Sequence, residues 1–247
     1  VLVALAAARE RDAGLAVRTR GLAGRTDLPA FRVYCSEHAH SSVDKAVITL
    51  GLGHENLVKI PADAAFRMQS EALAAAIAAD RAAGRRPMAV VATLGTTSST
   101  AVDPIAEIAT LCEREGIWLH VDAAYGGALA LLPERRTQFV GLERADSLVV
   151  NPHKWIMTPM DCSVLWTRHP DVLRRAFSLT PEYLRTSEQD VALSYSDYSF
   201  QLGRRFRALK LWFVLRALGW RAFAPASATT ATWRSGLPRG WTPRRAG

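Results

Sequence analysis

Runs of five to eight mostly hydrophobic residues recur between residues 31 and 168, separated by segments whose apolar positions have helical spacing. The length and content of these runs are typical of buried strands. The predicted strands are residues 32–36, 56–60, 87–94, 117–123, 147–151 and 162–167. Strands that alternate with helices in this way predict an α/β sheet with crossover helices. Alternation in the strand at 117–123 places Ile117, Leu119 and Val121 on one face and Asp122 on the other.

Helical patterns lie between most of these strands. The clearest is predicted to begin at Asp103 as the capping residue, with Pro104 at the first helical position and a stop at Gly116. Its apolar face comprises Ile105, Ile108, Ala109 and Cys112. The hydroxyl run TTSST at 96–100 is expected to take part in the same helix start. Residues 70–83 and 205–218 are further predicted helices.

The composition is that of a folded globular protein, because 49% of the 247 residues are hydrophobic and 22% are charged. No uncharged apolar run reaches about 18 residues, so we expect neither a membrane span nor a signal peptide. The cysteines, Cys35, Cys112 and Cys162, form no C-x-x-C pair, which favours a reducing cytoplasm. His38 and His40 have no third partner at zinc-ligand spacing, so we expect no metal site.

The net charge of +8 does not indicate a nucleic-acid partner. Four arginines and no acidic residue lie in the last segment, residues 224–247, and the GRRFR sequence leads an apolar helix without a basic stripe. Dinucleotide-binding, nucleoside-triphosphate-binding and nucleophile-elbow motifs are also absent from the sequence. These observations leave a small-molecule site as the main expectation.

Polar residues follow three predicted strands at the edge where an open α/β sheet binds ligands. Thr97 follows residues 87–94, Asp122 ends the strand at 117–123, and Lys154 follows residues 147–151. A lysine and a carboxylate on a buried edge each carry a desolvation cost unless a ligand or partner uses the charge. Pyridoxal 5′-phosphate would use both, through its aldehyde and its ring nitrogen. A structural salt bridge is the alternative that these residues leave open.

Six strings carry a more specific resemblance. They are AHSSVDKA (39–46), ATLGTTSSTAVDP (92–104), IWLHVDAAYGG (117–127), NPHKW (151–155), TPEYLRTSEQD (180–190) and LGRRFRALKLWFVLR (202–216). From residue 1 to about 223 the chain resembles the group II pyridoxal-phosphate-dependent amino acid decarboxylases, and within them the aromatic-L-amino-acid decarboxylases. The resemblance implies a cytoplasmic homodimer that acts on a small-molecule amino acid.

The resemblance also implies a domain organisation. Residues 1–199 would be an α/β large domain of the fold type I, aspartate-aminotransferase-like class, with a mainly parallel sheet flanked by helices and an incomplete N-terminal part. Residues 200–223 would begin a small C-terminal domain, and residues 224–247 would be a divergent, disordered tail. We expect the chain to be part of a longer subunit.

Roles for the reacting groups follow from the same resemblance. Lys154 matches the lysine that forms the Schiff base with the cofactor, and Asp122 matches the carboxylate that pairs with the pyridine nitrogen. His40 matches the imidazole stacked on the cofactor ring, on the face opposite Ala124. Tyr183 matches the loop tyrosine that returns a proton to Cα after carbon dioxide leaves.

Three further positions match residues around the cofactor. Thr97 corresponds to a hydroxyl near cofactor and substrate, and Asn151 and His153 correspond to contributors around the phosphate. His120, on the same strand face as Asp122, is instead predicted to be a hydrogen-bonded structural histidine.

The predicted reaction is decarboxylation of an L-amino acid, with an aromatic substrate favoured. Glutamate, diaminobutyrate and histidine decarboxylases share much of the motif set and stay open as alternatives. An inactive or partner-dependent fragment and an aldehyde-forming enzyme are also open, although Tyr183 argues against aldehyde chemistry, because aldehyde-forming relatives tend to replace that tyrosine.

Overall fold

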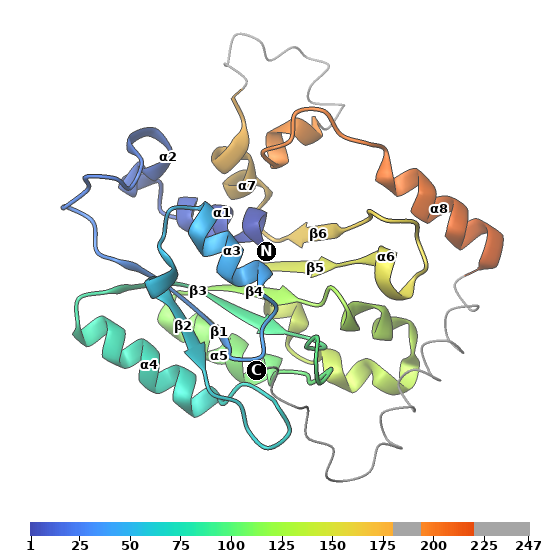
Figure 1. Cartoon of the computed structure of the whole chain (residues 1–247), viewed down its shortest axis with the longest axis horizontal. Coiled ribbons are helices and arrows are strands. Elements are labelled where there is room, and N and C mark those ends of the chain that lie inside the picture. The colour runs from blue at the N-terminus through green and yellow to red at the C-terminus, as the bar shows by residue number, and fades with distance from the viewer. Residues whose placement is uncertain (180–193, 220–247) are drawn as a thin grey trace, which may run out of the picture.

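The computed structural model describes residues 1–179 and 194–219, and a six-stranded sheet lies at its centre (Figure 1). The strands are β1 (Phe31–Ser36), β2 (Leu57–Ile60), β3 (Arg86–Thr93), β4 (Trp118–Asp122), β5 (Ser147–Val150) and β6 (Val164–Thr167). They lie in the order β2-β1-β3-β4-β5-β6. Strands β1 to β5 are parallel and β6 pairs antiparallel with β5. All six predicted strands are confirmed, as is the mainly parallel α/β class.

Helices cover both faces of this sheet. On one face α4 (Ser70–Ala82) and α5 (Ile105–Glu115) pack their apolar sides against Leu119 and Val121 of β4. On the other face α1 (Leu2–Glu10), α3 (Ser42–Thr49) and α7 (Pro170–Phe177) form a second core that includes Trp118. Figure 1 shows α1, α3 and α7 gathered beside one another, with α4 on the other side of the strands. The predicted alternation along β4 is therefore confirmed.

The remaining elements are shorter or more exposed. They are the helices α2 (Val17–Arg20), α6 (Pro152–Trp155) and α8 (Arg207–Leu218), and the 3-10 turns Ala13–Leu15, His54–Asn56, Gly126–Leu131, Pro133–Phe139, Leu142–Arg144 and Tyr195–Tyr198. The helix predicted at 205–218 is confirmed as α8, although none of its residues is buried. The tail predicted to be disordered, residues 224–247, lies outside the described residues.

The start of α5 differs from the prediction. Pro104 occupies the capping position and no side chain caps the helix. The Asp103 carboxylate instead accepts hydrogen bonds from two distant backbone amides, those of Met68 (2.8 Å) and Thr93 (2.7 Å). The hydroxyl run does not cap α5 either, because the Thr96 and Ser99 hydroxyls bond to each other at 2.7 Å and close their own turn. Both capping predictions were wrong, because amides outside the helix occupy the Asp103 carboxylate and the hydroxyls are used within their own turn.

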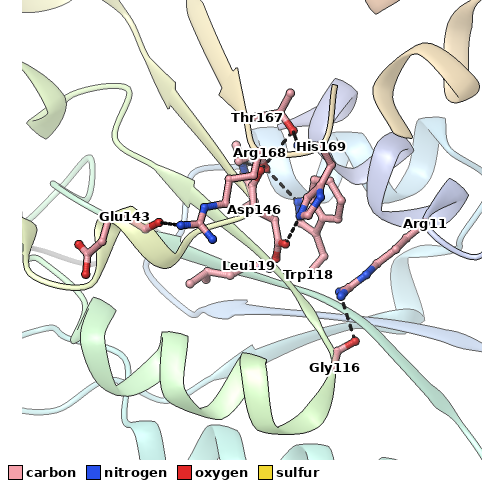
Figure 2. A network of polar contacts seen from close by, with 11 residues as sticks. Arg11, Gly116, Trp118, Leu119, Glu143, Asp146, Thr167, Arg168 and His169 are labelled. Atoms are coloured by element: carbon pink, nitrogen blue, oxygen red, sulfur yellow. Dashed lines mark hydrogen bonds and ion pairs between the residues drawn. The ribbon is translucent and has the colours of Figure 1, made fainter. Parts of the chain in front are cut away.

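A polar network joins β4, β5 and β6 (Figure 2). It lies where β4 and β5 begin, whereas the predicted site residues lie where these strands end. The Asp146 carboxylate accepts a hydrogen bond from the Leu119 amide at 2.7 Å and lies 2.7 Å from Nε2 of His169. The Thr167 hydroxyl and the Arg168 amide both donate to the Asp146 carbonyl. The network joins three strands, so it stabilises the frame on which the site is built.

His120 has the structural role predicted for it. Its ring is fully buried, and Nδ1 lies 2.9 Å from the Ser147 hydroxyl, which also accepts a hydrogen bond from the Trp118 indole. Burial lowers the pKa of His120 well below its usual value, so the ring stays neutral.

Within residues 1–179 and 194–219 no helix has the length and apolar character to cross a membrane, and no cluster of three potential metal ligands occurs.

Candidate active site

A cavity of about 190 Å³ opens at the carboxyl ends of β3, β4 and β5, the edge at which parallel sheets bind ligands. The turn before α3, the start of α1, α6 and the start of β6 complete its wall. The lining residues are Val1, His40, Ser42, Thr93, Gly95, Thr97, Asp122, Ala124, Tyr125, Val149, Asn151, Lys154 and Ser163. Six of the eight predicted site residues therefore line one cavity, although they come from four segments of the chain.

Asp122 ends β4, where it pairs in register with Thr93 of β3 and Val149 of β5. Its side chain is buried, and one carboxylate oxygen accepts a hydrogen bond from the Ala124 amide at 3.0 Å. Within the described residues no ion pair joins a cation to Asp122, and the amino group of Val1, which lines the same cavity, interacts with it only at longer range. A buried carboxylate without a bonded cation is costly, so this group suits a cationic or hydrogen-bond-donating ligand.

Thr93 gives a second indication of an absent ligand. Its hydroxyl is buried and has no hydrogen-bond partner, although it lines the same cavity beside Asp122. Buried polar atoms are nearly always paired, so an orphaned hydroxyl here fits a site that a polar ligand completes. The sequence did not single out Thr93, because it lies within an apolar strand.

Lys154 reaches the cavity from α6, a single turn that starts with Pro152 directly after β5. The Lys154 amide donates to the Asn151 carbonyl at 2.9 Å, which fixes the turn. Trp155 packs edge-on against Tyr125 at 4.8 Å between ring centroids, so α6 is held to the segment after β4. The Lys154 side chain is exposed, and no ion pair joins it to Asp122 in the described residues. The structural salt bridge left open by the sequence is therefore not formed.

His40 lies in the turn that leads into α3. Its Nδ1 accepts a hydrogen bond from the Ser42 amide at 3.1 Å, which orients the ring and leaves Nε2 as the protonated nitrogen of the neutral form. Thr97 lines the same cavity from an exposed corner that follows Gly95. Gly95 has a φ of +92°, a conformation that side chains rarely adopt, so the corner depends on glycine there.

The two positions predicted near the phosphate have different surroundings. Asn151 lines the cavity, and its Oδ1 accepts a hydrogen bond from the Ser163 hydroxyl at 2.6 Å. His153 does not line the cavity. Its Nδ1 lies 3.0 Å from the Cys162 amide and 2.6 Å from the Cys162 carbonyl, so contacts with the chain before β6 fix the ring. The role predicted for His153 gains no support from this geometry, and Tyr183 lies outside the described residues.

Glycines after β4 allow the cavity wall to close. The Gly126 amide donates to the Leu94 carbonyl at 3.0 Å, and a Cβ on Gly126 would lie only 2.4 Å from that carbonyl oxygen. A Cβ on Gly127 would lie 2.4 Å from Cγ2 of Val150. The segment after β4 thus rests directly on the ends of β3 and β5, which brings Asp122, Ala124 and Tyr125 to the same edge.

A larger groove of about 1000 Å³ lies elsewhere, beside α1, α2 and α7. None of the predicted site residues lines it, and its Arg18 guanidinium is bonded to the carbonyls of Arg175 and Ser178. Chemistry rather than size therefore selects the smaller cavity as the candidate active site.

Comparison with known proteins identifies the family to which the chain belongs. Residues 1–231 match the pyridoxal-dependent decarboxylase conserved domain. An aromatic-L-amino-acid decarboxylase of Bos taurus is 48% identical over 188 residues, which cover 75% of this chain and 38% of that protein. A tryptophan decarboxylase of Camptotheca acuminata is 44% identical over 194 residues, covering 77% of this chain and 39% of that protein.

Solved structures give the same result at the level of the fold. The crystal structure of Catharanthus roseus tryptophan decarboxylase in complex with L-tryptophan superposes with a TM-score of 0.82 at 34% identity, over 97% of this chain and 52% of that one. The chain spans less than half the length of these two curated relatives. Since the family model covers most of the sequence, this chain belongs to the pyridoxal-dependent decarboxylase family.

Proposed function

We propose that this chain binds pyridoxal 5′-phosphate at Lys154 and forms part of an enzyme that decarboxylates an aromatic L-amino acid. The observation that carries the proposal is the cavity in which a lysine, a buried unpaired carboxylate and an orphaned hydroxyl meet. These groups fit pyridoxal phosphate, since the cofactor needs an amine for its aldehyde and a carboxylate for its ring nitrogen.

The proposed roles are those that the family resemblance implies, and the position of each side chain at the cavity supports them. The Lys154 Nζ would hold the cofactor covalently through the cofactor's aldehyde. The Asp122 carboxylate keeps a proton on the pyridine nitrogen, and the Ala124 amide bonded to Asp122 keeps that carboxylate oriented. His40, fixed by the Ser42 amide, provides a flat surface against the cofactor ring.

When bound, pyridoxal phosphate supplies a conjugated cation that accepts the electron pair of the Cα–carboxylate bond. The chain would select the bond that breaks through the orientation in which it binds the substrate. We propose that Thr97 contributes to this orientation from its corner of the cavity, that Asn151 and His153 contribute to phosphate binding, and that Tyr183 returns a proton to Cα.

The aromatic substrate class in this proposal rests on the relatives. The bovine and Camptotheca proteins are named for aromatic amino acids, and both exceed 40% identity over the aligned residues. We extend that substrate class to this chain as a proposal.

We further propose that the chain acts as a homodimer in the cytoplasm. Large apolar side chains on and beside α8 are exposed, with Phe206 at 74%, Trp212 at 53% and Phe213 at 57% of their surface. An apolar surface of this kind is typical of an interface. All three cysteines are buried and free of disulfides, which suits a reducing compartment.

The test is to incubate purified chain and cofactor with separate aromatic, acidic and diamino L-amino acids, and to measure carbon dioxide and amine. The proposal expects release of both from an aromatic substrate, and loss of that release in Lys154→Ala. Release only from acidic or diamino substrates would overturn the substrate class, and aldehyde in place of amine would overturn the reaction. Sedimentation of the same sample measures the dimer.

A further inference from the structure

Asp103 lies behind the candidate site rather than in it, and it is the residue whose contacts differ most from the sequence prediction. Its carboxylate is 2% exposed, and it accepts the Thr93 amide with one oxygen and the Met68 amide with the other. The Asp103 amide also donates to the Thr93 carbonyl at 3.0 Å. Three hydrogen bonds therefore tie one residue to the end of β3 and to the loop before α4.

Both tied segments support walls of the cavity. Thr93 carries the orphaned hydroxyl beside Asp122, and it leads directly into the corner at Gly95 and Thr97. The loop before α4 contains Phe66, whose ring packs edge-on against His38 at 5.3 Å. His38 lies two residues before His40, so the loop braces the turn that presents the histidine of the cavity.

We propose that Asp103 is a positioning residue of the candidate site, whose carboxylate holds the Thr93–Thr97 wall and the His40 turn in register with Asp122 and Lys154. This inference rests on the proposed function, because only a bound cofactor gives that register a purpose. Asp103 does not touch the cavity and takes no part in the chemistry.

The energetics of Asp103 favour positioning over stability. The pKa of Asp103 is raised to about 6, mainly by burial and to a smaller extent by Asp63, against the lowering effects of the two amide hydrogen bonds and of His38. Asp63 is paired with Arg67, and no ion pair joins a cation to Asp103 within the described residues. The unfolded chain would ionise Asp103 near 3.8, so its contribution to stability is greatest below that pH and is lost as the pH rises through 6. At neutral pH the fold thus carries a buried charge that weakens it.

The positioning effect has the opposite dependence on pH. Protonation turns one carboxylate oxygen into a hydroxyl, which is a weaker acceptor for the amide on that side and adds a proton that must find its own acceptor. Below about pH 6 the hydrogen bond from the Thr93 amide or from the Met68 amide to Asp103 therefore weakens. This happens even though burying the neutral carboxyl costs less free energy than burying the carboxylate. For a residue that served stability alone, overall stability and the strength of its hydrogen bonds would change in the same direction with pH.

The first test compares Asp103→Asn with the matched control Asp80→Asn. Asp80 is a carboxylate of similar burial, bonded to Arg32, Tyr34 and Arg85 at the other end of the sheet. The dissociation constant of pyridoxal phosphate is measured for each chain by its absorption change. We expect Asp103→Asn to weaken binding by about tenfold or more, and Asp80→Asn to leave it within about twofold. Equal binding by wild type and Asp103→Asn would overturn the inference while the proposed function stands.

The second test needs no variant and no cofactor. Amide hydrogen exchange of the wild-type chain is followed between pH 7.5 and 5, with the interior β3 amide of Val91 as the reference. We expect the protection factor of the Thr93 or Met68 amide to fall by about tenfold below pH 6 relative to Val91. Unchanged protection at both amides would overturn the inference. If protection of the Thr93 or Met68 amide falls as expected but the wild type does not bind cofactor, the proposed function is refuted. The hydrogen bonds from these amides to Asp103 are then still supported.

Discussion

Gly126→Ala would press a methyl group against the backbone that supports the candidate site. The added Cβ would lie 2.4 Å from the Leu94 carbonyl oxygen and 2.9 Å from its carbon, whereas real Cβ contacts stay above 3.0 Å. The segment after β4 must therefore move by at least 3.0 − 2.4 = 0.6 Å. Movement away from Leu94 also stretches the Gly126 to Leu94 hydrogen bond, now 3.0 Å, beyond a good bonding distance.

The expected cost follows from these two effects. Overpacking costs about 1–3 kcal/mol and a lost hydrogen bond about 1 kcal/mol, so Gly126→Ala should destabilise the chain by about 2–4 kcal/mol. For a protein of this size that corresponds to a fall in Tm of about 5–15 °C. Thermal unfolding followed by circular dichroism at one scan rate measures it.

The matched control is Gly203→Ala, because a Cβ on Gly203 would meet no atom within 4 Å and its φ is not in the left-handed region. We expect the Tm of this variant to stay within about 2 °C of the wild type. If Gly126→Ala melts at the same temperature as Gly203→Ala, the close approach of the segment after β4 to the end of β3 is wrong.

Two further predictions concern the frame around the site. Asp146→Ala should destabilise the chain by about 1–3 kcal/mol in urea unfolding, because the Leu119 amide and His169 lose their shared acceptor; an unchanged midpoint would contradict the network. Burial raises the pKa of Cys112 to about 12, so its thiol should resist alkylation at pH 8 in the folded chain and react fully in denaturant. Rapid alkylation of folded Cys112 would show that α5 does not cover it.

The strands and most helices could be predicted because their signals are local. An apolar run such as residues 87–94 is long enough to identify a buried strand, and the alternation in β4 assigns Leu119 and Asp122 to opposite faces. Strand direction is not local, so the antiparallel pairing of β6 could not be read from its residues. It depends on the connection through α6 and the chain that follows.

Part of the candidate site could be predicted because the strands that carry it could be predicted. Asp122 and Lys154 follow strands, and parallel strands bring their ends together, so their meeting was predictable. Asp103 was predicted as a helix cap because its neighbours fit one, but amides from Met68 and Thr93 approach only in the folded chain. Thr93 was missed because a hydroxyl inside an apolar strand carries no signal until its unpaired state is seen.

The central claim is that Lys154 is the residue that holds pyridoxal phosphate, and the chain allows a clean test because it has only four lysines, Lys45, Lys59, Lys154 and Lys210. Purified chain is mixed with equimolar pyridoxal phosphate, reduced with borohydride, digested, and mapped by mass spectrometry. The account predicts one cofactor per chain, on Lys154, and no defined adduct in Lys154→Ala. Labelling spread over Lys45, Lys59 and Lys210, or no labelling at all, would contradict it.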